Sequence, residues 1–206
     1  MFVVVEGVEG SGKSTLVGSL ADRLRADGYE VTATREPGGT PLGNSIRETF
    51  LNREVAIAPL AEAMLVNAAR AQHVEEVIRP ALAAGRLVIC DRFTDSTFAY
   101  QGYGRGVDLD VLRRLCDVAT GGLEPHLVLV LDVPVDTARE RLGKRAQATD
   151  RIENESDDFH QRVRGGFLAL AANSPYHRVL DGTLPAKRLS EEALAVLRKR
   201  LELHVQ

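Results

Sequence analysis

The residues best placed to do chemistry stand near the amino terminus, in the run Gly7-Val8-Glu9-Gly10-Ser11-Gly12-Lys13-Ser14. This run matches the pattern G-x-x-x-x-G-K-[ST] at every fixed position, between a predicted strand and a predicted helix. In such a loop, backbone N–H groups and the positive end of the helix dipole point toward a chain of phosphates. Lys13 is placed to reach the outer phosphates, and the Ser14 hydroxyl to coordinate the Mg²⁺ that accompanies a nucleoside triphosphate. The spacing therefore predicts a triphosphate-binding loop.

The same run could serve a simple turn, a dinucleotide or a guanine nucleotide, but the sequence favours none of these. A tight strand-to-helix turn would use Gly10 and Gly12 but would not also need a lysine and a serine after them. A dinucleotide-binding turn needs a third glycine or alanine where this chain has Thr15. No Asn-Lys-x-Asp motif, which reads guanine, occurs in the sequence, and its absence disfavours a GTPase.

A second pair of chemically active residues follows the apolar run Leu87–Cys90. Asp91 and Arg92 stand there at the carboxyl end of a predicted strand, which is the edge where open α/β sheets bind ligands. Asp91 could hold Mg²⁺ directly or through water, and Arg92 could bind an acceptor phosphate through two parallel hydrogen bonds. The alternative is a simple surface ion pair. The location favours a kinase with a pocket for an acceptor.

The segment Gly143–Arg151 is a polar connection between two predicted helices and carries Lys144, Arg145 and Arg151 without a matching cluster of acids. A phosphoryl group in transfer spreads negative charge over its oxygens, and an arginine that reaches it is worth roughly 10³ to 10⁵ in rate. Because the loop positions Val8–Ser11 hold no arginine, we expect this segment to be a lid that supplies one. The alternative for such a charged run is a solvated helix end.

Hydrophobic patterning predicts the elements that position these groups. Apolar runs predict buried parallel strands at Phe2–Glu6, Leu87–Cys90 and Leu127–Asp132, with weaker candidates at Glu30–Thr34 and Arg178–Leu180. Helical periodicity covers Lys13–Ala26, Ala58–Ala84 (with or without a break near Pro80), Asp108–Ala119, Val135–Leu142, Asp157–Ala172 and Ser190–Leu203. The glycine-rich stretches Gly38–Gly43 and Gly102–Gly106 are predicted loops. This alternation predicts an α/β protein with a P-loop NTPase fold, in which helices flank a five-stranded parallel sheet. We expect a single domain over residues 1–206, with a short lid at about 143–152.

Composition and charge narrow the partners. The 26 basic and 29 acidic residues give a net charge of −3, so no broad surface for nucleic acid or anionic lipid is expected. No segment approaches the roughly 20 apolar residues of a membrane span, and no export signal is visible. Cys90 and Cys116 lack metal-binding spacing, which predicts two buried thiols in a reduced, cytoplasmic protein.

The loop and five further blocks resemble bacterial thymidylate kinases. The other blocks are Thr34–Thr40 (Thr-Arg-Glu-Pro-Gly-Gly-Thr), Ala68–His73, Asp91–Phe93, Ser96–Gly102 and Asp150–Glu153. The resemblance runs in register from Met1 to about Pro175. It implies transfer of the γ-phosphoryl group of ATP to dTMP with Mg²⁺, a homodimer, and the type in which the arginine lies in the lid. Ser14 and Asp91 would hold the metal, and the ATP site would comprise Gly7, Val8, Glu9, Gly10, Ser11, Gly12, Lys13, Ser14 and Thr15.

The resemblance also implies which residues hold the phosphate and sugar of dTMP. Arg35 and Arg92 would hold the phosphate, and Glu9 would accept a hydrogen bond from the sugar 3′-hydroxyl. Pro37 would shape the loop, with a cis bond after Glu36, because that form is far more accessible before proline than elsewhere. Tyr100 would pack beneath the sugar and exclude a 2′-hydroxyl. Transition-state charge would be met by Lys13 and one or more of Lys144, Arg145 and Arg151, with Asp91 and Arg92 completing the catalytic set.

For the base, the resemblance implies that Arg70 donates to a thymine carbonyl and that Thr97 and Gln101 complete the polar edge. Val66 stands four residues before Arg70, on the same helix face, and would lie against the base. The family usually has phenylalanine there, so valine forfeits an aromatic contribution of roughly 0.5–1.5 kcal/mol. Two alternatives stay open: a kinase for another pyrimidine monophosphate, and a switch that binds ATP without an acceptor.

Overall fold

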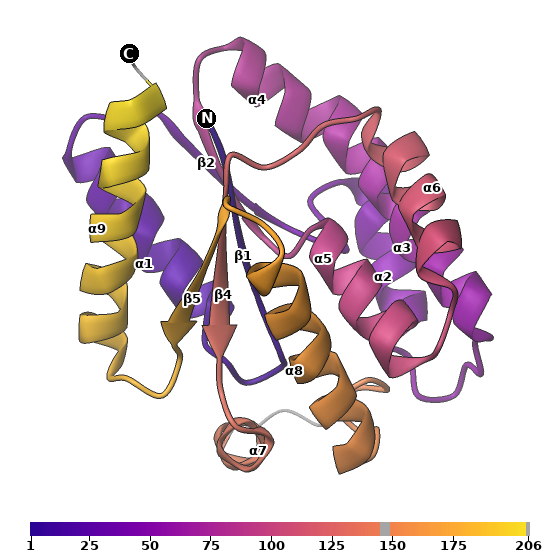
Figure 1. The fold of residues 1–206 in the computed structure, drawn as a ribbon. Coiled ribbons are helices and arrows are strands. Elements are labelled where there is room, and N and C mark those ends of the chain that lie inside the picture. The colour runs from indigo at the N-terminus through magenta and orange to yellow at the C-terminus, as the bar shows by residue number, and fades with distance from the viewer. Residues whose placement is uncertain (145–148, 205–206) are drawn as a thin grey trace.

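The computed structural model describes residues 1–144 and 149–204. Within these ranges, five parallel strands form one sheet in the order β2-β3-β1-β4-β5 (Figure 1). The strands are β1 (Phe2–Gly7), β2 (Val31–Arg35), β3 (Leu87–Asp91), β4 (Leu127–Asp132) and β5 (His177–Asp181). The three strongly apolar runs form the central strands, and the two weaker candidates are the half-exposed edges. The predicted five-stranded parallel sheet is confirmed.

Helices cover both faces of this sheet (Figure 1). The α-helices are α1 (Lys13–Ala26), α2 (Pro41–Leu51), α3 (Pro59–His73), α4 (Arg79–Ala83), α5 (Thr94–Thr97), α6 (Leu109–Thr120), α7 (Val135–Gly143), α8 (Asp157–Ala172) and α9 (Ala186–His204). The π-helical segments are η1 (Val74–Ile78) and η2 (Phe98–Gly104). Alternate residues of β1 enter two cores. Val3 and Val5 share one core with the leucines of α1 and α9, whereas Phe2 and Val4 share the other with α3 and α8.

The long helical segment predicted at Ala58–Ala84 is not one regular helix. α3 ends at His73, a π-helical turn follows in η1, and α4 begins at Arg79. Pro80 lies in the first turn of α4, where its missing N–H leaves no hydrogen bond unmade. In a regular α-helix its ring would clash with the carbonyl four residues earlier, and the wider π turn directly before it accommodates that group.

α2 overlaps the end of the loop predicted at Gly38–Gly43 and continues to Leu51, over residues for which no element was predicted. The helix begins at Pro41, after Thr40, whose hydroxyl accepts a hydrogen bond from the N–H of Gly43 at 3.0 Å. A threonine cap followed by proline at the first helical position is a start signal that the sequence contains. The prediction missed this helix and therefore missed Arg47, which the helix carries.

The loop predicted at Gly102–Gly106 is also partly wrong, because η2 includes Gly102 and Gly104. A Cβ added at Gly102 would stand 2.5 Å from the side chain of Leu109, and one at Gly104 would stand 2.7 Å from Phe159. The two glycines therefore let α6 and α8 pack closely against η2.

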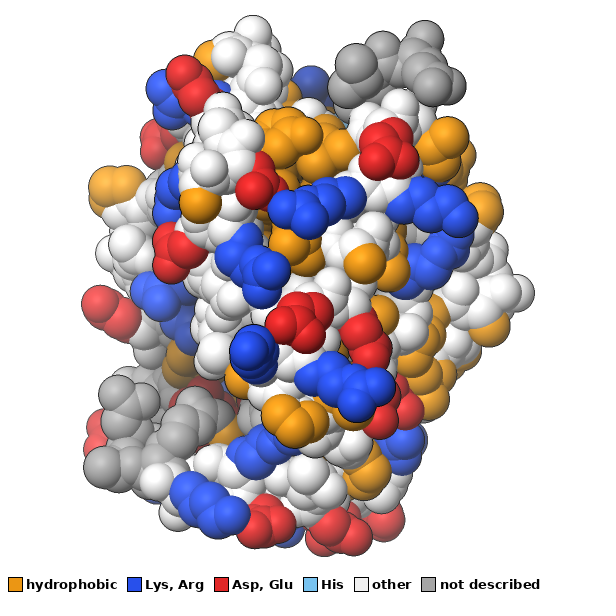
Figure 2. Space-filling model, turned by 90° about the vertical axis from the view of Figure 1, so that its left-hand side faces the viewer, with side chains coloured by type: hydrophobic (Ala, Val, Ile, Leu, Met, Phe, Trp, Pro, Cys, Tyr) orange, Lys and Arg blue, Asp and Glu red, His pale blue; other side chains and the backbone are white. Residues whose placement is uncertain are grey.

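Figure 2 shows how charged side chains are distributed on one face of the molecule. On the face shown in Figure 2, Lys and Arg side chains are interspersed with Asp and Glu and form no single basic area. None of the helices in the described ranges combines the length and the apolar composition that crossing a membrane requires.

Candidate active site

The predicted phosphate-binding loop turns between the end of β1 at Gly7 and the start of α1 at Lys13. Gly10 and Gly12 have φ angles of 74° and 96°, which glycine adopts without steric cost. A Cβ added at Gly10 would stand 2.5 Å from the carbonyl oxygen of Ala138 in α7, whereas one at Gly12 would meet nothing within 4 Å. Glycine therefore allows the close approach of α7 at the first position and supplies the backbone conformation at both.

The side chain of Lys13 folds back over the phosphate-binding loop. Its Nζ donates to the carbonyl oxygen of Val8 at 2.8 Å and to Ser11 Oγ at 3.3 Å. Burial, together with the nearby charge of Arg92, lowers the pKa of Lys13 to about 8. The ammonium group is thus held beside the loop amides, where a phosphate chain would restore its preference for the charged form.

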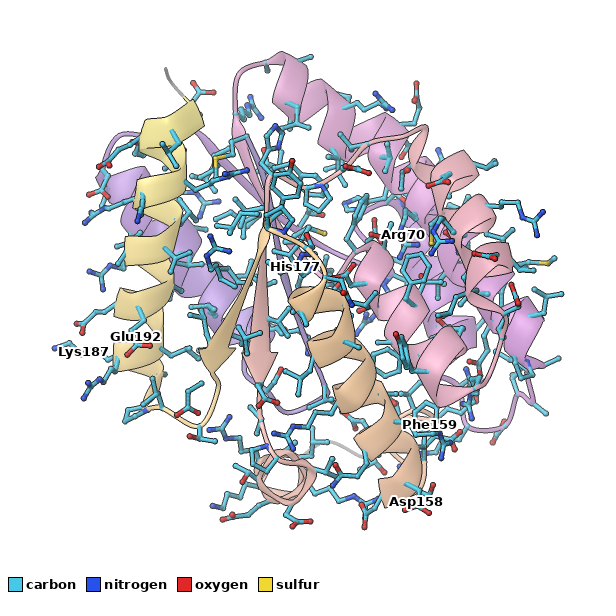
Figure 3. The ribbon with its side chains drawn as sticks, in the orientation of Figure 1. Arg70, Asp158, Phe159, His177, Lys187 and Glu192 are labelled. Atoms are coloured by element: carbon cyan, nitrogen blue, oxygen red, sulfur yellow. The ribbon has the colours of Figure 1, made fainter. Side chains whose placement is uncertain are left out.

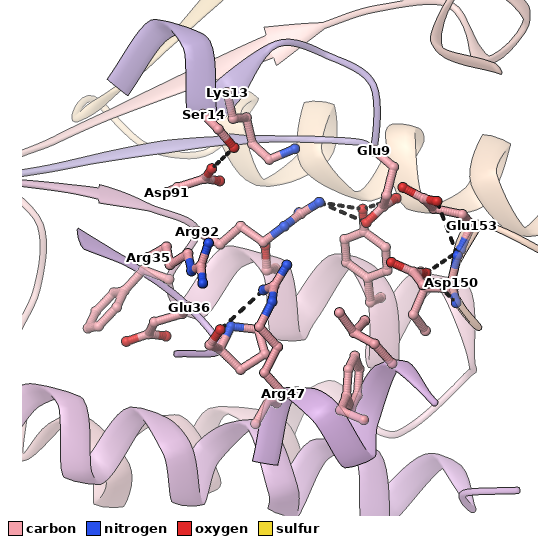
Figure 4. Close-up of a pocket in the computed structure, with 18 of the residues that line it drawn as sticks. Glu9, Lys13, Ser14, Arg35, Glu36, Arg47, Asp91, Arg92, Asp150 and Glu153 are labelled. Carbon is pink, nitrogen blue, oxygen red and sulfur yellow. Dashed lines mark hydrogen bonds and ion pairs between the residues drawn. The ribbon is translucent and has the colours of Figure 1, made fainter. Parts of the chain in front are cut away.

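Ser14 and Asp91 meet at the carboxyl edge of the sheet. Ser14 Oγ donates to Asp91 Oδ2 at 2.5 Å (Figure 4). The contact arises because β1 and β3 are neighbours, with Val5 paired to Asp91. A hydroxyl and a carboxylate are hard oxygen donors, which Mg²⁺ prefers, so this pair fits a magnesium ion beside the loop.

Arg92 follows β3 with a φ of 75°, in the left-handed region that is uncommon for any residue except glycine. Its guanidinium donates to the carbonyl oxygen of Gly7 at 2.9 Å, to Glu9 Oε1 at 2.7 Å and to Tyr100 Oη at 3.2 Å. Burial opposes the charged form, but Tyr100 and Glu9 outweigh it and raise the pKa of Arg92. A permanent positive charge therefore stands where the loop meets the rest of the site.

Glu9 has both carboxylate oxygens engaged. Oε1 accepts from Arg92, and Oε2 accepts from the hydroxyl of Tyr100 at 2.6 Å. Burial would raise the pKa of Glu9, but the charges of Arg92 and Lys13 outweigh burial and lower it. An ionised carboxylate has further lone pairs, so it can accept another hydrogen bond from a ligand hydroxyl.

Glu6 supports this arrangement and was not predicted as a site residue, although a charged group at the end of an apolar strand was a visible signal. Its carboxyl group accepts from the N–H of Phe93 at 2.7 Å and from Ser96 Oγ at 2.6 Å. Ser96 Oγ in turn accepts from Arg92 at 3.1 Å. Burial, followed by the charge of Asp95, raises the pKa of Glu6 to about 8. The residue holds the turn that presents Arg92.

A cavity of about 470 Å³ extends from the loop across the carboxyl edge of the sheet (Figure 4). Predicted site residues in its lining are Glu9, Gly10, Gly12, Lys13, Ser14, Thr15, Arg35, Pro37, Val66, Arg70, Asp91, Arg92, Thr97, Tyr100 and Gln101. Residues far apart in the sequence therefore meet in one space. The lining also includes Arg47 and Arg141, which the sequence analysis did not single out.

Three arginines line this cavity beside the phosphate-binding loop: Arg35, Arg47 and Arg92 (Figure 4). Arg35 ends β2 and is exposed, and Arg47 donates to the carbonyl oxygen of Pro37 at 3.1 Å. Burial, followed by the charges of Arg35 and Arg92, lowers the pKa of Arg47. Mutual repulsion of this kind would be relieved by a bound anion. The bond between Glu36 and Pro37 is cis, as expected.

Arg70, labelled in Figure 3, is a buried residue of α3 that lines the cavity, and its side chain reaches Thr97 of α5. Its Nε donates to Glu36 Oε2 at 2.7 Å, and its Nη1 donates to Asn67 Oδ1 at 2.8 Å and to Thr97 Oγ1 at 3.0 Å. Nη2 donates to the carbonyl oxygen of Phe93 at 2.9 Å. Nη1 also contacts Cys116 Sγ at 3.7 Å, so the second N–H of Nη2 is the donor that Arg70 keeps for a ligand carbonyl.

Glu36, His73 and Cys90 form a second group of metal-ligand types, close behind Arg70. They are already engaged, because Glu36 bonds Arg70 and His73 Nδ1, the latter at 2.9 Å, while His73 Nε2 lies 2.7 Å from Thr34 Oγ1. Burial raises the pKa of the Cys90 thiol and keeps it protonated. The group therefore joins α3 to β2 and β3, and Cys90 and Cys116 are buried thiols as expected.

Of the predicted lid cations, the two that the structure describes do not line the cavity. Lys144 is exposed and pairs with Glu140 at 2.6 Å, and the predicted Arg145 lies outside the described residues. Arg151 donates to the carbonyl oxygen of Phe50 at 2.9 Å and to Glu62 Oε1 at 2.5 Å, and its Nη2 is buried without a partner. Arg151 is thus held between α2 and α3 and is not part of the cavity lining.

Comparison with known proteins identifies relatives over the whole chain. The family model for thymidylate kinase matches residues 5–193. A thymidylate kinase of Desulfovibrio desulfuricans is 49% identical over 100% of this chain and 97% of its own length. One from Deinococcus radiodurans is 48% identical over 97% of each chain, and one from a Synechococcus species is 55% identical over 85% of this chain and 82% of its own.

Proposed function

Because the chain belongs to the thymidylate kinase family, it is a nucleoside monophosphate kinase that forms dTDP from dTMP, and we propose that its cavity holds both nucleotides with their phosphates facing each other. One observation carries this arrangement. The same cavity is lined by the amide-rich loop with Lys13 and by a separate set of arginines, Arg35, Arg47 and Arg92. Two sets of anion-binding groups in one space suit a donor phosphate chain and an acceptor phosphate.

The donor end would bind ATP through Gly7–Thr15. Lys13 would pair with the outer phosphates, and Ser14 and Asp91 would hold Mg²⁺ through the oxygens that meet at 2.5 Å. When bound, the metal would neutralise part of the charge on the transferring group. This chain's own contribution would be to fix the phosphates through backbone amides of the loop.

The acceptor end would bind dTMP by its phosphate and sugar. Arg35 and Arg92 would hold the phosphate, and Pro37 would shape the loop beside it. Glu9 would accept from the 3′-hydroxyl while Arg92 and Tyr100 keep its carboxylate in place. The Tyr100 ring, which packs against Arg92 and Phe167, would lie beneath the sugar.

The base would lie at the end of the cavity lined by Val66, Arg70, Thr97 and Gln101. Arg70 would donate to a thymine carbonyl, and the network around its guanidinium holds it in one orientation. Transition-state charge would be met by Lys13 with one or more of Lys144, Arg145 and Arg151. The contacts of Arg151 with Glu62 and Phe50 favour Arg145 for this role.

An ADP-release assay across a panel of nucleoside monophosphates tests the proposal. We expect ATP turnover to require dTMP, with dUMP slower and dCMP slowest. A kinase for another pyrimidine monophosphate would prefer dCMP, and a nucleotide-dependent switch would turn over ATP at a rate that no monophosphate changes.

We further infer a cytoplasmic homodimer in which each chain is a single kinase domain with a lid at about 143–152. α3 and α6 lie side by side, and each keeps apolar side chains exposed, among them Met64 and Val118. Burying these side chains against a second copy would be favourable. Light scattering should give twice the chain mass of 22.4 kDa, and the 22.4 kDa value itself would contradict the dimer.

A further inference from the structure

Glu62 lies on α3 directly behind the base end of the cavity but is not part of the lining. Its side chain is only 1% exposed. Oε2 accepts from Gln101 Nε2 at 3.2 Å, and the two oxygens also accept from Arg105, at 3.1 and 3.2 Å, and from Arg151 at 2.5 Å. Two guanidinium groups thus balance the buried charge of this carboxylate.

This contact determines which way the amide of Gln101 faces. A side-chain amide can turn over, exchanging its NH₂ and its carbonyl oxygen, because the two ends are nearly the same size. An ionised carboxylate only accepts hydrogen bonds, so it holds the NH₂ end of Gln101 toward itself. The carbonyl oxygen Oε1 is therefore turned away from Glu62, toward the cavity that Gln101 lines.

We propose that Glu62 is a specificity-positioning residue, which fixes the amide of Gln101 so that the site takes a pyrimidine with a ring N–H and rejects one with a ring acceptor. Thymine and uracil carry a hydrogen on N3 that Oε1 can accept. Cytosine has a lone pair on N3, which would face the Oε1 lone pairs without a proton between them. A buried polar group left unpaired in this way discriminates strongly between substrates. The proposal rests on the proposed function, because it places the pyrimidine edge against Gln101.

The test replaces Glu62→Gln and measures kcat/KM for dTMP, dUMP and dCMP. A neutral amide of the same size can donate or accept, so Gln101 becomes free to turn over and present its NH₂ to cytosine. We expect the preference for dTMP over dCMP to fall at least about tenfold. The preference for dTMP over dUMP should stay the same, because both bases carry the N3 hydrogen. A general loss of packing would not separate the two ratios.

Arg105→Gln is the matched control, because it removes one partner of the same carboxylate and leaves the bond to Gln101. Its dTMP-to-dCMP ratio should equal that of the parent. If Glu62→Gln does not fold, the double variant E62Q/R105Q replaces it, because it also removes one of the two arginine charges that Glu62 balances. Its dTMP-to-dCMP ratio is then compared with that of Arg105→Gln.

An E62Q ratio equal to the parent's would overturn the proposal, as would a change of the same size in Arg105→Gln. In a Gln101→Leu background, E62Q should leave the ratio unchanged, and a further change there would contradict positioning through Gln101. A parent enzyme that does not phosphorylate dTMP at all would instead overturn the proposed function.

Discussion

The two ends of the cavity are built in different ways. Apart from Asp91 at the end of β3, the donor end is contiguous, from Gly7 to Thr15, within one strand-turn-helix unit. The acceptor end collects Arg35 from β2, Arg47 from α2 and Gln101 from η2, together with residues of α3 and of the turn after β3. A contiguous loop binds through amides that its own φ angles direct, whereas the acceptor end needs side chains that only the tertiary fold brings together. The phosphate-binding loop is therefore common to many enzymes, and the substrate is chosen at the assembled end.

The lid arginines offer the largest expected effect, because they would act where the two ends meet. We predict that Arg145→Met lowers kcat by roughly 10³ and leaves dTMP affinity unchanged. An arginine that reaches the transferring phosphoryl group, called here the arginine finger, stabilises charge that develops only in the transition state. Arg151→Met should instead lower Tm by about 4–8 °C, for a loss of about 2 kcal/mol, because it leaves Glu62 with one cation fewer. A coupled ADP assay and scanning calorimetry measure the two effects.

Lys187→Met is the control for both, since Lys187 is exposed on α9, far from the cavity (Figure 3). A thousandfold fall in kcat for Arg151→Met at an unchanged Tm would make Arg151 the finger. If Arg145→Met lost dTMP affinity and kcat to the same extent, Arg145 would not be the residue that stabilises the transition state.

Arg35→Met tests whether the acceptor end binds phosphate separately from the donor end. We expect the KM for dTMP to rise about 10- to 100-fold, as the loss of a charged hydrogen bond of about 1.5–3 kcal/mol implies. The KM for ATP should change less than about twofold. Arg35→Lys keeps the charge without the paired donors, so its KM for dTMP should lie between those of the parent and Arg35→Met. A parallel loss of ATP affinity would show that the two ends are not separable.

At the donor end, ATP affinity should depend on the protonation of Lys13. Its pKa of about 8 in the free protein means that the ammonium form dominates at pH 7 and is lost as pH rises through 8. Bound phosphates favour the charged form, so the Kd for ATP should rise about tenfold between pH 7.5 and 9.5. Titration calorimetry would measure this, with Lys13→Arg, which stays charged, as the reference. The same slope in both proteins would assign the effect to another group.

Val66→Phe should have the smallest effect and concerns the acceptor end alone. A ring at this position would restore an aromatic contact with the base of about 0.5–1.5 kcal/mol, so the KM for dTMP should fall about 2- to 10-fold. Val66→Leu, which adds bulk without a ring, is the control. A rise in KM for both variants would mean that the cavity has no room at this position.

Sequence reasoning recovered much of the fold because the informative signals were short-range. The apolar runs of β1, β3 and β4 and the glycine spacing of the loop can be read within ten residues. Two elements were missed because of their glycines. The start signal of α2, a threonine cap and a proline, stands among the glycines of Gly38–Gly43, and η2 itself contains glycines, which usually mark a loop. Glu6 was visible as a charged group at the end of an apolar strand, but its role was not, because its hydrogen-bond partners Phe93 and Ser96 lie 87 and 90 positions away.

The sequence by itself determined the phosphate-binding loop and the parallel sheet, since backbone preferences and hydrophobic periodicity act between near neighbours. The other predicted cavity residues came from the resemblance to thymidylate kinases. Only the tertiary structure decided how charges are paired. Arg151 turned to Glu62, 89 positions away, and Glu62 also bonds Gln101, 39 positions away. A buried charge must find a partner in space, and spacing along the chain does not say which one the fold will bring within reach.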